Sequence, residues 1–143
     1  MGCGDTLLTL SANAKINLTL DILGTREDGY HEVAMIMQEI SLHDTLSMGK
    51  INQGISLTIV IEGQQGTLPA DESNLCWKAA ALVQKEYNLQ EGVEIHLTKR
   101  IPMAAGLAGG SADAAAVLKG MNHLFRLGMT EARQIGRASC RER

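Results

Sequence analysis

The sequence has few aromatic residues and no long apolar run, and both absences limit what the protein can be. One Trp, one Phe and two Tyr occur among 143 residues, so a core has to be built from aliphatic side chains. A hydrophobic share of 45% still suffices for one folded domain and argues against disorder. No apolar run approaches the roughly 20 residues of a membrane-spanning helix, and residues 1–10 lack the pattern of a signal peptide. We therefore expect a cytoplasmic protein.

Paired cysteines and an excess of positive charge are absent as well. Cys3, Cys76 and Cys140 are odd in number and far apart, which is typical of free thiols in a reducing compartment and not of a disulfide framework or a zinc site. The histidines show no metal-ligand spacing. A formal net charge of −3 argues against a broadly basic nucleic-acid binder. The expected partner is a small molecule, with no nucleic acid or membrane, and the oligomeric state stays open.

The last ten residues, QIGRASCRER at 134–143, differ from everything before them. They contain three Arg and one Glu and have no apolar periodicity. They resemble the translation of a common sequencing-adapter oligonucleotide. We expect a non-native tail at 134–143 and a single partial domain over 1–133.

Apolar residues recur at every second position through much of the first 62 residues. Ile16, Leu18 and Leu20 alternate with polar residues, which is typical of a half-buried strand. Asp28-Gly29 and His43-Asp44 are interpreted as turns. The pattern predicts strands over 7–23, 33–42, 45–50 and 55–61.

The period changes to that of helices after residue 74. A helix is predicted over 75–88, capped by Ser73 or Asn74, and a strand over 93–97 that stops at Pro102. A second helix is predicted over 111–125, and another is expected to begin at 130–131. The core face of the 111–125 helix is predicted to carry Ala114, Leu118, Met121 and Phe125. This order indicates an α+β domain whose antiparallel or mixed sheet is covered by helices on one face.

The segment PMAAGLAGGSADAA at 102–115 leads into the second predicted helix. It is neither a Walker loop, because no Gly-Lys-Ser or Gly-Lys-Thr follows, nor a dinucleotide fingerprint. Unpaired N–H groups at a helix start attract phosphate, and glycines let it come close. The alternative is that the glycines only permit a tight turn. Ser111 either caps the helix or binds a phosphate or its metal ion, and Asp113 either turns away or acts through Mg²⁺.

Lys15 and Asn17 are two residues apart on the first predicted strand and so share its polar face. They are either the solvated side of an edge strand or a pair that meets a substrate. Tyr30 and His31 follow a turn and offer an aromatic face beside a hydrogen-bonding edge.

The segment at 102–115 resembles the second signature motif of the GHMP kinases, a superfamily of small-molecule kinases. SANAKINL and DGYHEV within 11–33, LHDTL at 42–46 and KRIP at 99–102 are similar to one member whose substrate carries a cytidine diphosphate group. The resemblance runs from about Ser11 to Arg126. It implies the GHMP kinase N-terminal domain, a ribosomal-protein domain 2-like fold, incomplete at its C-terminus.

The resemblance also implies roles for individual residues. Lys15 would be catalytic, beside the reacting hydroxyl, and Asn17, Tyr30 and His31 would bind the cytidylyl substrate. ATP, as its Mg²⁺ complex, would be held by the glycine-rich segment. The residues implied in ATP binding are Pro102, Met103, Ala104, Ala105, Gly106, Leu107, Ala108, Gly109, Gly110, Ser111 and Ala112.

The family's catalytic aspartate lies in a Gly-Ala/Ser-Asp-Val-Pro segment that does not occur in these 143 residues. We therefore expect the parent enzyme to phosphorylate its substrate and this chain, without the C-terminal domain, to be inactive. The alternatives are another GHMP kinase, or a non-catalytic nucleotide- or RNA-binding module of the same fold. A nucleotide-dependent oxidoreductase is disfavoured because the glycine-rich segment comes late, after several strands.

Overall fold

Four strands and two helices make up the described part of the chain. The computed structural model describes residues 7–25, 31–103 and 109–130. In chain order the elements are β1 (Leu8–Thr25), β2 (His31–Ile51), β3 (Ile55–Ile61), α1 (Leu75–Glu86), β4 (Gly92–Lys99) and α2 (Gly109–Phe125). The predicted α+β class is confirmed.

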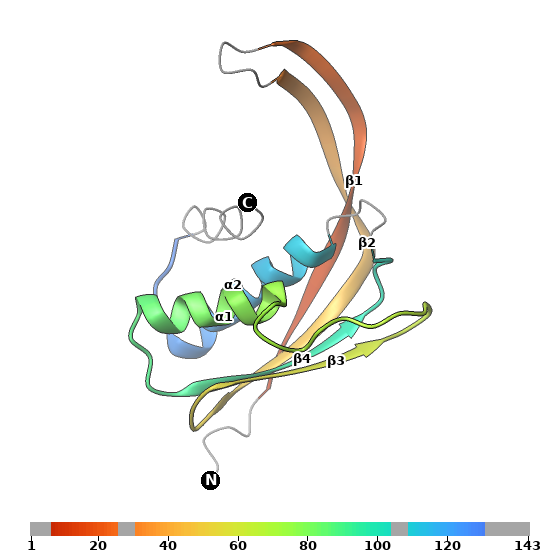
Figure 1. Ribbon diagram of the computed structural model, residues 1–143. Helices are drawn as coiled ribbons and strands as arrows, with labels where there is room; N and C mark the ends of the chain where they lie inside the picture. Colours follow the sequence, from red (N-terminus) through yellow and green to blue (C-terminus); the bar gives the residue numbers. More distant parts are fainter. Residues whose placement is uncertain (1–6, 26–30, 104–108, 131–143) are drawn as a thin grey trace.

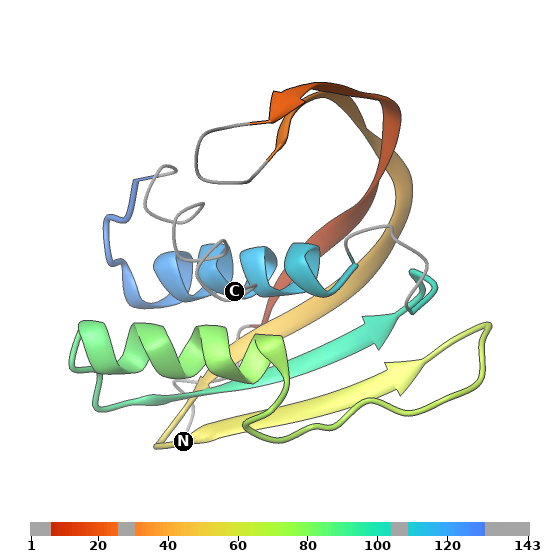
Figure 2. The same cartoon turned by 45° about the horizontal axis from the view of Figure 1, so that its top comes forward.

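The four strands form one mixed sheet in the order β1-β2-β4-β3. β2 pairs antiparallel with both β1 and β4, whereas β3 runs parallel to β4. Both helices cover one face of this sheet, as the sequence predicted (Figure 1). The far parts of β1 and β2 continue beyond the other strands as a two-stranded ribbon that curves toward the helices (Figure 2).

The core lies between the sheet and the helices, because alternate residues of each strand point that way. Val93, Ile95 and Leu97 of β4 are buried on the helix side, whereas His96 between them is exposed. The helices bury small and aliphatic residues against them: Ala79, Ala80 and Val83 from α1, and Ala114, Ala116, Val117, Leu118 and Met121 from α2. Of the predicted core face of α2, three members are buried and Phe125 is partly buried.

Two predictions of local structure are wrong. The expected turn at His43-Asp44 does not form, because β2 is one continuous strand and Asp44 points into the core. Helix α2 begins at Gly109 and not at Ser111, so Ser111 lies inside the first turn and does not occupy the N-cap position. Of the two residues predicted to cap α1, Asn74 is confirmed, since its side chain accepts a hydrogen bond from the backbone N–H of Cys76. The helix expected from 130–131 falls largely outside the described residues.

Gly92 begins β4 at a point where two backbones pack against each other. A Cβ atom there would overlap both the carbonyl carbon of Gln53 and the carbonyl oxygen of Gly54. Backbone atoms cannot rotate away as a side chain does, so the β2–β3 connection would have to shift.

We predict that Gly92→Ala lowers the free energy of unfolding by about 2 kcal/mol, the usual cost of overpacking a rigid site. Urea unfolding followed by circular dichroism measures it. Ser56→Ala, at an exposed position of β3, is the control and should change stability by less than about 0.5 kcal/mol. Equal midpoints for both variants would contradict the close backbone approach at Gly92.

Candidate functional site

The glycine-rich segment connects the end of β4 with the start of α2. Residues 100–103 and 109–112 are described and form its two stems, whereas the predicted ATP-binding residues 104–108 lie outside the described residues. The candidate site is therefore built from the stems and from the side chains that hold them.

A buried ion cluster joins the two stems. The ammonium group of Lys99, the last residue of β4, donates to Asp44 Oδ2 at 2.7 Å and to Asp113 Oδ2 at 2.8 Å. These three residues, here called the Lys99 cluster, are at most 4% exposed. Because they come from β4, β2 and α2, one side chain links the entry stem, the neighbouring strand and the helix that follows the loop.

Asp44 also fixes the backbone of the entry stem. Its Oδ1 accepts hydrogen bonds from the N–H groups of Arg100 at 2.6 Å and Ile101 at 2.8 Å. The carboxylate therefore holds the chain immediately after the last residue of β4. Hydrogen bonds to a charged acceptor are the stronger kind in proteins.

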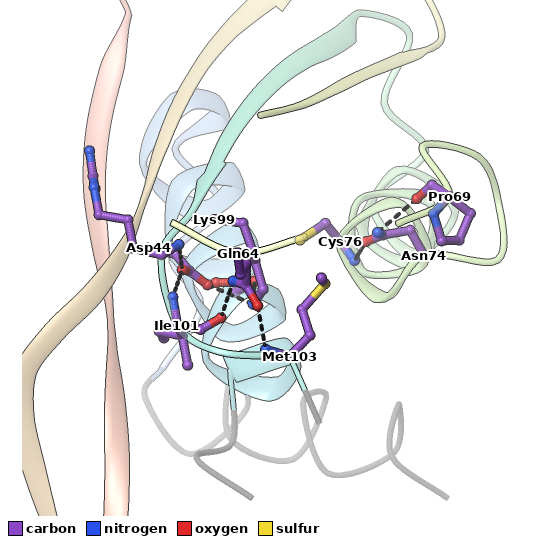
Figure 3. Close-up of polar contacts among 10 residues, drawn as sticks. Asp44, Gln64, Pro69, Asn74, Cys76, Lys99, Ile101 and Met103 are labelled. Atoms are coloured by element: carbon purple, nitrogen blue, oxygen red, sulfur yellow. Dashed lines mark hydrogen bonds and ion pairs between the residues drawn. The ribbon is translucent and has the colours of Figure 1, made fainter. Parts of the chain in front are cut away.

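Gln64 holds the entry stem from another side. Its amide nitrogen donates to the carbonyl oxygen of Ile101 at 3.0 Å, and its amide oxygen accepts from the N–H of Met103 at 3.0 Å. The N–H of Glu62 donates to the carbonyl oxygen of Lys99 at 2.9 Å, so the segment after β3 runs beside this stem. Figure 3 shows Asp44, Lys99 and Gln64 gathered around Ile101 and Met103.

The exit stem is the first turn of α2, and its two glycines lack a side chain for different reasons. A Cβ atom at Gly109 would lie 2.9 Å from Lys99 Nζ and 3.1 Å from Ile101 Cγ2, so the Lys99 cluster leaves no room for a side chain there. Gly110 is exposed, and among the described residues a Cβ atom there would meet only Leu75 Cδ1, at 3.3 Å. The N–H groups of a first helical turn have no partner within the helix, and the dipole is positive at this end. The exit stem is thus suited to an anion.

The pKa values of the two carboxyl groups in the Lys99 cluster shift in opposite directions. Burial, the largest cause, and a hydrogen bond with Asp44 together raise the pKa of Asp113 to about 8, against the opposing effect of Lys99. Burial also acts to raise the pKa of Asp44, but hydrogen bonds with Asp113, the Ile101 backbone, Lys99 and the Arg100 backbone lower it overall. For Lys99, burial lowers the pKa, and the bonds to both carboxyl groups outweigh it. At neutral pH these directions correspond to one proton on Asp113, an ionised Asp44 and a charged Lys99.

The sequence-predicted substrate residues lie on the long strands. Lys15 is exposed on β1. In the backbone register of the sheet, Lys15 lies opposite Glu39 and Asn17 lies opposite Met37 of β2, with no register shift between them. His31 is placed as the first residue of β2, and Tyr30 lies outside the described residues.

The predicted ATP-binding residues that are described divide between the stems. Pro102 is exposed and Met103 is partly buried on the entry stem. Gly109, Gly110, Ser111 and Ala112 form the first turn of α2. Asp113 turns into the core and pairs with Lys99, which fits the first of the two roles that the sequence left open for it.

Sequence reasoning missed Asp44, Lys99 and Gln64. Two of them had a signal: Asp44 precedes Leu46 at the core-facing spacing of β2, and Lys99 follows Leu97 in the same way on β4. Opposite charges at inward positions of two neighbouring strands suggest a buried ion pair. Gln64 gave no such signal, because it lies in a polar loop and bonds only to backbone.

Neither described helix has the length and apolar character needed to cross a bilayer. Within residues 7–25, 31–103 and 109–130, no three side chains of His, Cys, Asp or Glu group together in a way that could hold a metal ion.

Comparison with known proteins finds relatives that are similar to this chain in sequence and in fold. Residues 74–142 match the model of the GHMP kinases N terminal domain, a range that contains both helices, β4 and both stems. The chain is 53% identical over 125 residues to a 4-diphosphocytidyl-2-C-methyl-D-erythritol kinase of Acetivibrio thermocellus, covering 87% of this chain and 43% of that protein. An enzyme of the same name from Synechococcus sp. (strain JA-2-3B'a(2-13)) is 56% identical over 122 residues, covering 85% and 38%. The chain thus spans about two fifths of the length of the curated relatives it matches.

Solved structures agree with the sequence matches. A crystal structure of 4-(cytidine 5'-diphospho)-2C-methyl-D-erythritol kinase superimposes with a TM-score of 0.78 at 35% identity, covering 94% of this chain and 46% of that one. A homoserine kinase from Cytophaga hutchinsonii superimposes with a TM-score of 0.71 at 20% identity, over 95% of this chain and 41% of that one, and shares the fold. The chain is therefore similar in sequence to the GHMP kinases, and its sheet and helices are those of their N-terminal domain.

Proposed function

We propose that the two stems hold the phosphate groups of ATP at the start of α2. The observation that supports this most directly is the partly exposed first turn of a 17-residue helix, in which Gly110 lies at the surface while Lys99 holds the helix through Asp113. A helix start of this kind offers N–H groups and a positive dipole to an anion. ATP as its Mg²⁺ complex brings the phosphates that these groups would bind, and Ser111, inside the first turn, would assist.

The proposed reaction is phosphorylation of the 2-hydroxyl of 4-diphosphocytidyl-2-C-methyl-D-erythritol, in the non-mevalonate route to isoprenoid precursors. Support comes from two curated relatives of that name at 53% and 56% identity. In this proposal Lys15 stabilises the reacting hydroxyl as it loses its proton, while Asn17, Tyr30 and His31 orient the cytidylyl group. Phosphoryl transfer depends mainly on such positioning and on neutralising phosphate charge. The proposal concerns a protein of the relatives' full length that contains this chain.

We predict that Gly110→Ala weakens binding of Mg²⁺·ATP by about tenfold, because the added methyl group stands where a phosphate would approach the backbone. Isothermal titration calorimetry on the 143-residue chain measures it. Alanine is the better helix former, so a loss of binding would not reflect unfolding. Lys119→Ala, exposed further along α2, is the matched control.

Inorganic tripolyphosphate should show the same difference between Gly110→Ala and the unchanged chain, since only the phosphates meet the helix. Unchanged affinity of the Gly110 variant for both ligands would contradict a phosphate site at the start of α2.

We predict that Lys15→Ala lowers kcat by about a hundredfold, as expected when a charge beside the reacting centre is removed. The assay is ATP-dependent formation of ADP with 4-diphosphocytidyl-2-C-methyl-D-erythritol, in a protein that contains this chain and has the relatives' length. Lys78→Ala, an exposed lysine of α1, serves as the control. Activity with homoserine or mevalonate and none with the cytidylyl substrate would contradict the proposed reaction.

A further inference from the structure

The Lys99 cluster contains two carboxyl groups and one ammonium group, and the two carboxyl groups are not equivalent. Asp44 accepts three hydrogen bonds, from Lys99 and from the N–H groups of Arg100 and Ile101. Asp113 accepts one, from Lys99, and can form a hydrogen bond with Asp44 only by donating a proton of its own. The Oδ1 atom of Asp113 is buried without a hydrogen-bond partner among the described residues. A buried carboxylate oxygen without a donor is costly, whereas a protonated carboxyl group carries less charge to satisfy.

We propose that Asp113 is a positioning residue of the phosphate site, which holds the first turn of α2 on Lys99 while it is itself a neutral carboxylic acid. The effect of Asp113 on ATP binding rests on the proposed function, because the turn that Asp113 holds is the one assigned to the ATP phosphates. It goes beyond that function in naming a residue that acts without touching ATP.

The reason for a neutral acid is the charge beneath the helix start. Lys99 and an ionised Asp44 sum to zero, and an ionised Asp113 would add one negative charge directly under the turn. That charge would repel a triphosphate and oppose the helix dipole. The neutral acid keeps the hydrogen bond from Lys99 without this repulsion.

The groups that face Asp113 come from each element packed against it. β4 contributes Lys99, β2 contributes Asp44 and α1 contributes Cys76, whose thiol pKa is raised by burial and then by the negative charge of Asp113. β1 also packs against α2, and its buried described side chains are Ala12 and Ala14. Asp113 is therefore the group of this environment whose charge changes near neutral pH, where burial raises its pKa to about 8.

The sign of the pH effect on stability follows from this pKa. The folded chain holds a proton on Asp113 that the unfolded chain, with an ordinary carboxyl pKa of 3.8, releases at much lower pH. The contribution of Asp113 to stability is therefore complete below pH 3.8 and is lost as the pH rises toward 8.

The experiment compares the unchanged chain with Asp113→Asn, whose amide has one acceptor and one donor group, like a protonated acid. We expect the folding equilibrium constant of the unchanged chain, relative to the variant, to fall by at least about tenfold between pH 5 and 8. Urea unfolding at each pH measures it. Asp71→Asn removes an exposed carboxyl group whose pKa is lowered and should leave the slope as it is.

The pH dependence of Mg²⁺·ATP affinity is a second measurement, and it would not change if Asp113 only stabilised the fold. Between pH 7 and 9 the affinity of the unchanged chain should fall about threefold or more relative to Asp113→Asn, because only the unchanged chain gains the negative charge. If neither the unchanged chain nor a protein of the relatives' length that contains it binds ATP at any pH, the proposed function fails, while the unfolding slope still decides the protonation of Asp113.

A third measurement does not need the variant to fold. The side-chain carboxyl carbon of Asp113, followed by nuclear magnetic resonance in the unchanged chain, should titrate between about pH 7 and 9. Titration below pH 5, or equal pH slopes of unfolding for the unchanged chain and Asp113→Asn, would overturn the inference.

Discussion

The ammonium group of Lys99, shared by two carboxyl groups, is the interaction on which the arrangement of the site depends. It joins the end of β4, the middle of β2 and the second turn of α2 at distances of 2.7 and 2.8 Å. The chain between Lys99 and Gly109 leaves the sheet and returns as a helix, and nothing in the periodicity of either element determines where the helix begins. The Lys99 cluster determines where the helix begins, because it joins Lys99, the last residue of β4, to Asp113, which lies near the start of α2.

The strands and helices could be predicted from the sequence because their apolar residues recur at the periods of the two structures. β3 and the start of α1 were predicted at their observed positions, and the ends of β1 were missed by one or two residues. The turn at His43-Asp44 was wrong for a definite reason. A polar pair inside an alternating segment usually marks a turn, but here Asp44 is stabilised by a lysine 55 residues further along the chain. Local sequence contains no record of a partner at that distance.

The glycine-rich segment was interpreted from the sequence as either a phosphate site or a tight turn, but the separate reasons for its glycines needed the structure. Gly109 is small because Lys99 Nζ and Ile101 lie against it, and Gly110 is small at an exposed position. A sequence pattern treats both as loop flexibility. In the folded protein the first is a packing requirement set by a buried charge, and the second leaves the helix start open to solvent.

Burying three ionisable groups is not an obvious way to stabilise a domain, since a buried ion pair often contributes no more than well-packed apolar side chains would. The surface of α2 suggests what the cluster supplies instead. Its buried face combines the small residues Ala114, Ala116 and Gly120 with Val117, Leu118 and Met121. Apolar contact of this kind is not directional. The directional bonds from Lys99 add a fixed point, and they do so near the end of the helix where the first backbone N–H groups have no partner within the helix.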